Sequence, residues 1–173
     1  MKRPRNNYIN NKDFYNAIVE YQEKCRLADE EGKQQPIMPK YLGECITQIA
    51  NRLATKPNFR GYSYKEEMIS DGILNCLEYF NNFNPEKSQN PFAYYTQIIY
   101  YAFLRRIERE KKALYTKYKA IGQVNLDASL NAATEDANII HEVIQQSEGS
   151  VAYMENFIKD YEAKVLKKDN NDK

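Results

Sequence analysis

The segment that begins at Asn90-Pro91 most constrains what this chain can fold into. An asparagine side chain can accept hydrogen bonds from the first free amides of a helix, and a proline at the first helical position loses nothing by lacking an amide hydrogen. Apolar residues then recur at three- and four-residue spacing, which indicates one buried helix face. That face is predicted to hold Phe92, Tyr95, Ile99, Ala102 and Phe103. Gly122 is the predicted end of the helix.

The same spacing predicts three earlier helices. The first covers residues 11–31, with Asn10 or Asn11 as its cap, and the second runs from residue 39 or 40 to Lys56-Pro57. The third follows Ser63 and Glu66, which have the spacing of a capping box. Its predicted buried stripe is Ile69, Ile73, Cys76, Phe80 and Phe83.

The predicted fold class is all-α, because no strand pair with hairpin chemistry is found. Residues 1–122 are predicted to form a helical domain, and residues 123–173 a weakly structured C-terminal tail. Within the tail, residues 137–146 and 151–168 are predicted as short helices, and residues 169–173 as disordered.

The net charge of +1 is unevenly distributed along the chain. From Gln123 onward ten acidic residues stand against five basic ones, so the tail carries −5 and residues 1–122 carry +6. A basic body indicates an anionic partner, and an acidic tail indicates a different one. No apolar run approaches the ~20 residues that span a membrane. The basic N-terminus precedes no apolar stretch, so no secretory signal is predicted.

No catalytic, metal or cofactor site is predicted. The chain has no glycine-rich phosphate loop and no cysteine–histidine cluster. Its three cysteines are far apart and are predicted to be small core residues in a reducing cytoplasm. The single histidine, His141, has no accompanying nucleophile and is predicted to be an exposed surface residue. The sequence therefore argues against an enzyme.

The predicted long helix changes from aromatic to basic along its length. Tyr94-Tyr95 and Tyr100-Tyr101 cannot all face inward, because neighbours on a helix point about 100° apart. Tyrosines at helical spacing are more often packing residues than base platforms, and a basic strip alone is usually a solvated face. Together they favour nucleic-acid binding. The basic residues are Arg105, Arg106, Arg109, Lys111, Lys112, Lys117 and Lys119.

Carboxylates gather at the start of the predicted third helix, at Glu66-Glu67 and Asp71. Their position suits the positive end of the helix dipole. An exposed acidic patch for docking explains them equally well, and composition does not decide between the two readings.

Several segments, in order and at matching spacing over residues 7–120, resemble region 2 of bacterial sigma factors. They are Glu67-Met68-Ile69-Ser70-Asp71-Gly72-Ile73, Phe80-Asn81-Asn82-Phe83, Pro91-Phe92-Ala93-Tyr94-Tyr95 and Leu104-Arg105-Arg106. With Asn7-Tyr8-Ile9-Asn10 and Gly61-Tyr62, the pattern is similar to the late-transcription sigma factors of T-even-type tailed bacteriophages.

The resemblance implies two binding surfaces on a sigma region 2-like helical bundle. The helix at 67–77 would dock on the clamp helices of the largest subunit of the host RNA polymerase core, and the helix at 94–106 would meet the promoter −10 element. The implied core-binding residues are Glu67, Ser70, Asp71, Ile73 and Leu74. The implied DNA-binding residues are Tyr94, Tyr95, Tyr100, Tyr101, Arg105, Arg106, Arg109, Lys111 and Lys112.

The chain departs from the family in several places. Ile98-Ile99 replaces the aromatic pair that abuts the duplex fork in housekeeping sigma factors, and Ala102 replaces a polar base-reading residue. No region reading a −35 element follows Gly122. The phage factors engage the DNA sliding clamp through a C-terminal tail, for which the nearest residues here are Tyr153, Met154, Phe157, Ile158 and Tyr161.

The expected function is therefore that of a sigma factor, in the cytoplasm of an infected bacterial host, which directs core polymerase to phage late promoters by recognising and melting an A·T-rich −10 element. Its expected partners are core polymerase, promoter DNA, the phage sliding clamp and a late co-activator, without a membrane. The alternative is a helical adaptor, co-activator or inhibitor that binds polymerase or clamp without contacting DNA.

Overall fold

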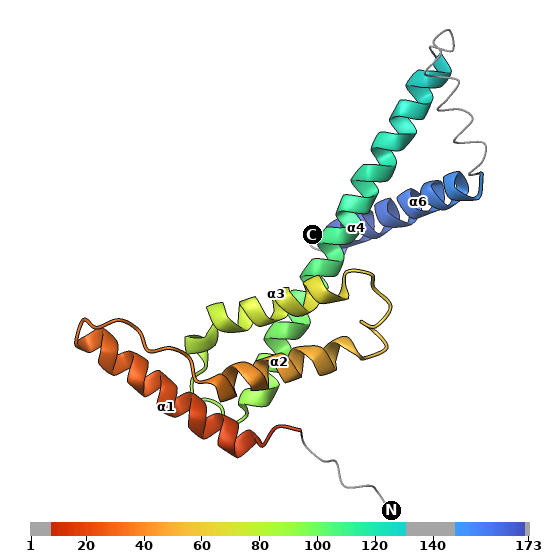
Figure 1. Cartoon of the computed structure of the whole chain (residues 1–173). Helices are drawn as coiled ribbons and strands as arrows, with labels where there is room; N and C mark the ends of the chain where they lie inside the picture. The colour runs from red at the N-terminus through yellow and green to blue at the C-terminus, as the bar shows by residue number, and fades with distance from the viewer. Residues whose placement is uncertain (1–7, 131–147, 172–173) are drawn as a thin grey trace, which may run out of the picture. The chain divides into compact units, whose positions relative to one another are not determined.

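The computed structural model describes residues 8–130 and 148–171, and every regular element in these residues is a helix, which confirms the predicted all-α class (Figure 1). The elements are α1 (Asn11–Glu30), α2 (Lys40–Ala54), α3 (Lys65–Glu78), the short 3-10 helix η1 (Phe80–Asn82), α4 (Pro91–Leu130) and α6 (Glu148–Asn171). Two compact units divide inside α4, as Met1–Ile107 and Glu108–Lys173. The predicted boundary at residue 122 lies 15 residues beyond this division.

The first half of α4 supplies the centre of the first unit. Tyr95, Ile99 and Phe103 have no exposed surface, and they occupy successive turns of one face, as the apolar spacing predicts. Phe14 of α1 packs against Tyr95 with ring centroids 5.7 Å apart, and Phe59 packs edge-on against Phe103 at 5.1 Å. The elements α1 to η1 therefore share one core built on α4.

The helices α3 and α4 approach closely at Gly72. A Cβ atom at this position would lie 2.9 Å from Cγ2 of Ile99 and 3.0 Å from Cε1 of Phe103. Those distances are shorter than ordinary van der Waals contacts, so only a residue without a side chain allows this crossing.

Side chains of α1 hold the segment that leads into α4. The Asn11 amide donates to the carbonyl of Gln89 at 3.2 Å, and its oxygen accepts from the amide of Phe92 at 3.2 Å. Further along α1, Tyr15 donates to the carbonyl of Pro85 and Gln22 to that of Phe83. These bonds join parts of the sequence that are 61 to 81 residues apart.

Three predicted helix starts are confirmed and one is wrong. The helix α2 begins at Lys40, one of the two predicted positions. The Asn10 oxygen accepts from the amide of Lys12, and the Asn90 oxygen accepts from the amide of Ala93, so both asparagines cap as expected. The capping box at Ser63 does not form: α3 begins one residue later than that box requires, and its cap residue Tyr64 makes no side-chain capping hydrogen bond.

Two predicted helix ends are also wrong. The helix α3 stops at Glu78, and Phe80 reaches the core from η1 instead of from a continued stripe. The helix α4 continues through Gly122 to Leu130. One glycine costs a helix only ~1 kcal/mol, which packing on either side can offset.

In the second unit, α6 crosses α4 and contacts it at residues 115–119 (Figure 1). The ring of Tyr115 stacks on that of Tyr161 with centroids 4.6 Å apart, and Tyr118 meets Phe157 edge-on at 5.5 Å. The helix α6 is longer than the predicted helix at 151–168, and it includes residues 169–171, which were predicted to be disordered. The helix predicted at 137–146, and His141 within it, lie outside the described residues.

Candidate functional site

The outer face of α3, defined here as Glu67, Ser70, Leu74 and Leu77, is exposed along its length. Leu74 leaves 62% of its surface open, and Leu77 leaves 43%. These positions lie on one side because helix residues three and four apart are neighbours, while Met68 and Cys76 bury the opposite side. A row of two leucines beside a carboxylate can bind another protein's helix.

Ile73 and Asp71 do not belong to this outer face, although both were predicted to bind polymerase. Ile73 packs against the core. The carboxylate of Asp71 accepts two hydrogen bonds from Arg106 of α4, at 2.7 Å from Nε and 2.9 Å from Nη2. Only 22% of the Asp71 side chain and 18% of the Arg106 side chain are exposed. The docking role of Asp71 stays a prediction, and in this conformation its charge is already paired within the chain.

The same pair directs the Arg106 guanidinium at α3, and the predicted DNA-binding role of Arg106 stays a prediction. Its neighbour Arg105 is exposed, and its Nη2 atom donates to Asn75 Oδ1 at 2.6 Å. Asn75 in turn donates to the carbonyl of Asp71 at 2.8 Å. A neutral amide orients Arg105 without neutralising it, so its positive charge remains available at the surface.

The four tyrosines in the first half of α4 divide into a packed pair and an exposed pair. Tyr94 packs edge-on against Phe83, and Tyr95 is fully buried, with its hydroxyl donating to the carbonyl of Phe80 at 3.0 Å. Burial raises the pKa of Tyr95, which keeps this hydroxyl protonated. Tyr95 therefore cannot contact DNA in this conformation. Periodicity predicts that Tyr95 faces inward, as observed, whereas the DNA contact that the family resemblance implies would require the ring to leave the core.

Tyr100 and Tyr101 form the exposed tyrosine pair, with 38% and 50% of their surfaces open. Their rings lie 5.9 Å apart at 74°. Phe59 supports Tyr100 edge-on at 5.6 Å, and the exposed cations Lys56 and Arg60 lie in the same turn as Phe59. Sequence reasoning missed these two cations because it treated their segment only as a turn; a basic residue on each side of an aromatic was the available signal.

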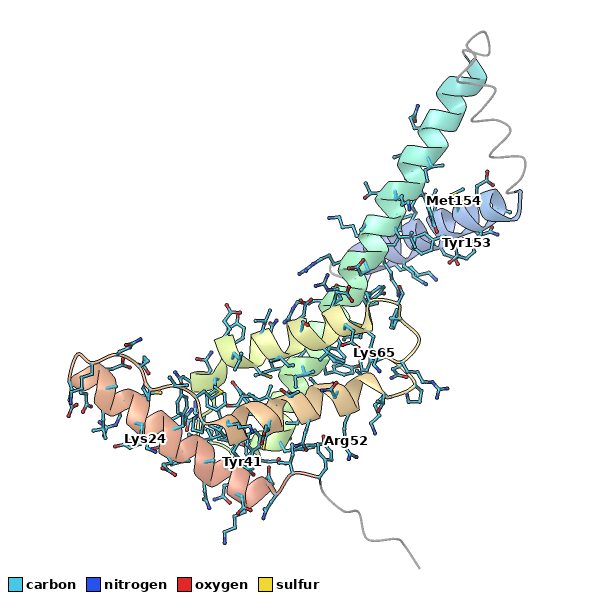
Figure 2. The ribbon with its side chains drawn as sticks, in the orientation of Figure 1. Lys24, Tyr41, Arg52, Lys65, Tyr153 and Met154 are labelled. Carbon is cyan, nitrogen blue, oxygen red and sulfur yellow. The ribbon has the colours of Figure 1, made fainter. Side chains whose placement is uncertain are left out.

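Figure 2 shows a further cation of the first unit, Arg52 on α2. Its guanidinium carbon lies 4.3 Å from the centre of the Tyr8 ring, a cation–π geometry. Tyr8 in turn packs edge-on against Phe92 at the start of α4. Arg52 thus anchors the segment that precedes α1.

Arg109, Lys111 and Lys112 are exposed on the part of α4 that belongs to the second unit, and their DNA-binding role stays a prediction.

The residues predicted to bind a sliding clamp lie on α6, where Figure 2 shows Tyr153 and Met154. Tyr153 is 60% exposed, whereas Met154 and Ile158 are half-buried. Phe157 and Tyr161 pack against α4 of the same unit. This segment is part of a helix pair and not an extended tail, and its clamp-binding role stays a prediction.

Comparisons with protein-family models and with curated proteins find no match to this chain. Over the described ranges, 8–130 and 148–171, no three potential metal ligands come together. No helix in those ranges is long and apolar enough to cross a membrane. Fold and surfaces thus define a helical protein with an outer α3 face suited to protein contact and an exposed tyrosine pair beside cations.

Proposed function

We propose that this chain is a sigma-type initiation factor, which directs a bacterial core RNA polymerase to phage late promoters with an A·T-rich −10 element. In this proposal the outer face of α3 docks on the clamp helices of the polymerase. The tyrosine pair and the nearby cations of the first unit engage the opened −10 strand. The phage sliding clamp and a late co-activator are further proposed partners.

The observation that carries the proposal is the exposed Leu74, set between Ser70 and Leu77 on a helix whose opposite side is buried. Fully burying a leucine contributes about 1.5–3 kcal/mol, so an exposure of 62% leaves a substantial part of that available to a partner. Glu67 on the same face can pair with an arginine of the partner helix.

The DNA side of the proposal is supported by Tyr100, Tyr101 and Arg105. Exposed rings can stack on unpaired bases, and each such stack contributes about 1–3 kcal/mol. Arg105, Lys56 and Arg60 can hold phosphates, which makes binding fall with rising salt. An A·T-rich target suits this small number of aromatic and basic side chains, since flexible T·A steps unstack easily.

Polymerase docking is tested by co-purification of purified core polymerase with the Leu74→Glu variant. We expect core binding to weaken by about tenfold or more, because a charge replaces an apolar contact. Leu27→Glu is the matched control, since Leu27 of α1 is also an exposed leucine, at 44%. Equal binding by both variants would refute docking through α3.

Strand opening is tested by run-off transcription with Tyr101→Ala on linear duplex and on pre-melted templates. We expect a larger loss on the duplex, because the ring acts on bases as they unstack. Tyr41→Ala is the control, since Tyr41 of α2 is a similarly exposed tyrosine, at 40% (Figure 2). The same loss on both templates would argue against a melting role.

A second candidate is a helical adaptor that binds polymerase without contacting DNA. The burial of Tyr95 and the pairing of Arg106 with Asp71 favour it, because both remove residues from the predicted DNA surface. Footprinting separates the two functions: the sigma-type factor with core polymerase protects a −10 segment, and the adaptor does not.

A further inference from the structure

The side chains of the second unit that the structure describes form no closed core, although several of them are aromatic. None of the side chains described there, at 108–123 and 152–167, is buried. Leu114 and Ile121 of α4 and Ile158 of α6 are only half-buried. Two helices cover only one side of each other, so an apolar side is left open to a third element.

Contacts between α4 and α6 fix the register of this pair. Glu162 of α6 accepts hydrogen bonds from the Tyr115 hydroxyl and from the Lys119 ammonium, each at 2.8 Å. The stacked rings of Tyr115 and Tyr161 lie beside them. The two helices thus present a defined surface, and a partner that docks there does not have to supply the free energy of ordering it.

A groove of about 550 Å³ lies along this surface. Its apolar lining comes mainly from Tyr161, Val165 and Leu166 of α6 and Tyr115 of α4. Val165 is 42% exposed and Leu166 is 64% exposed. Apolar residues lining a groove between two helices are the arrangement in which the apolar face of a third helix binds.

The charges at the groove select an acidic occupant. The carboxylate of Glu162 is already engaged by Lys119, and this contact lowers the pKa of Glu162. Lys112 lines the groove from α4, and no carboxylate in the described part of the chain pairs with it. An acidic side chain at the edge of the occupant would therefore meet an unpaired ammonium.

We propose that the groove between α4 and α6 docks an amphipathic helix of a partner protein, with its apolar face on Val165 and Leu166 and an acidic edge at Lys112. This activity goes beyond the proposed sigma-type function and does not depend on it. Nucleic acid explains the groove less well, because a phosphate backbone would contact Lys112 and leave the two apolar side chains exposed.

The test uses the full chain and three fluorescent peptides of about 18 residues, long enough to form several helical turns. All three carry the same leucine stripe, and their other positions are glutamate, lysine or glutamine. Fluorescence anisotropy measures binding. We expect the glutamate peptide to bind at least about tenfold more tightly than the lysine peptide, because several charges act together.

Variants locate the binding site. Leu166→Glu should weaken binding of the glutamate peptide by about tenfold or more. Lys112→Glu should reduce or reverse the preference for the glutamate peptide over the lysine peptide. Leu74→Glu, on α3 of the other unit, is the control and should leave peptide binding unchanged. This control also separates the groove from the proposed polymerase docking, because each surface has its own variant and assay.

Five results would overturn the proposal. The first three are the absence of peptide binding, equal binding of the acidic and basic peptides, and insensitivity of binding to Leu166→Glu. The fourth is a self-associated chain that Leu166→Glu converts to monomer in sedimentation equilibrium, which would assign the groove to a second copy of this chain. The fifth is displacement of the bound glutamate peptide by duplex DNA, together with loss of DNA affinity in Leu166→Glu. That result would assign the groove to nucleic acid.

Discussion

The crossing of α3 and α4 at Gly72 gives the sharpest test of the first unit. In Gly72→Ala the new methyl group would lie 2.9 Å from Cγ2 of Ile99, a stiff β-branched side chain with no exposed surface. Phe103, equally buried, blocks the other side at 3.0 Å. Overpacking of this kind costs about 1–3 kcal/mol.

A second glycine isolates this cost. Replacing glycine by alanine in a helix also gains up to ~1 kcal/mol from backbone propensity, and this gain applies equally to Gly43 of α2. No atom lies within 4 Å of a Cβ placed at Gly43. Gly43→Ala should therefore stabilise the protein, and the difference between the two variants should equal the steric term, about 1–3 kcal/mol.

Urea unfolding followed by helical circular dichroism measures both variants against the parent chain. We expect a lower free energy of unfolding for Gly72→Ala than for Gly43→Ala. Ile99→Ala should partly rescue Gly72→Ala, because it removes the clashing methyl group, and a double-mutant cycle would show this as a favourable coupling. Equal stability of the two alanine variants would refute the close approach of α3 and α4.

Three further outcomes are expected. Tyr95→Phe should lose about 1–2 kcal/mol, because the buried carbonyl of Phe80 loses its donor. Folding raises the pKa of Tyr95, so the protonated hydroxyl contributes its full share to the free energy of unfolding below about pH 10, and this contribution declines at higher pH. Urea unfolding should therefore show that the difference in stability between the parent chain and Tyr95→Phe becomes smaller in alkali. Asp71→Ala should cost about 1–3 kcal/mol by removing the carboxylate that accepts two hydrogen bonds from the half-buried Arg106, whereas Asp71→Ala combined with Arg106→Leu should recover part of that loss in the same measurement. Cys76, whose thiol pKa burial raises to about 12, should react with iodoacetamide only on unfolding, as mass spectrometry of the labelled peptide can show; rapid native labelling would contradict its burial.

Local signals in the sequence predicted the helices well where capping and apolar spacing agreed. Asn10 and Asn90 fix helix starts by accepting hydrogen bonds from amides of their own neighbours, and Pro91 does so through its fixed backbone angle, so sequence alone contains the information. Helix ends were predicted less well. Gly122 failed as a stop signal because tertiary contacts, such as that of Tyr118 with Phe157, support α4 near it.

The candidate site shows where sequence reasoning stops. The pair of Asp71 and Arg106 spans 35 residues, and it depends on how α3 and α4 cross, which spacing along one helix cannot predict. Leu74 was correctly selected as outward-facing, but the exposure of Leu77 and the cations around Phe59 were not recognised. Each depends on which neighbouring element covers the residue.

The hydrogen bonds from α1 to residues 83–92 have a consequence for synthesis on the ribosome. The side chain of Asn11 can form its two hydrogen bonds, with Gln89 and with Phe92, only after Phe92 has been made. At about 5–20 residues per second, the nascent α1 therefore waits several seconds with Phe14 and Ile18 uncovered. During that interval a chaperone can bind this stripe, and stop codons placed before residue 92 should yield chains whose N-terminal helix is open to proteases.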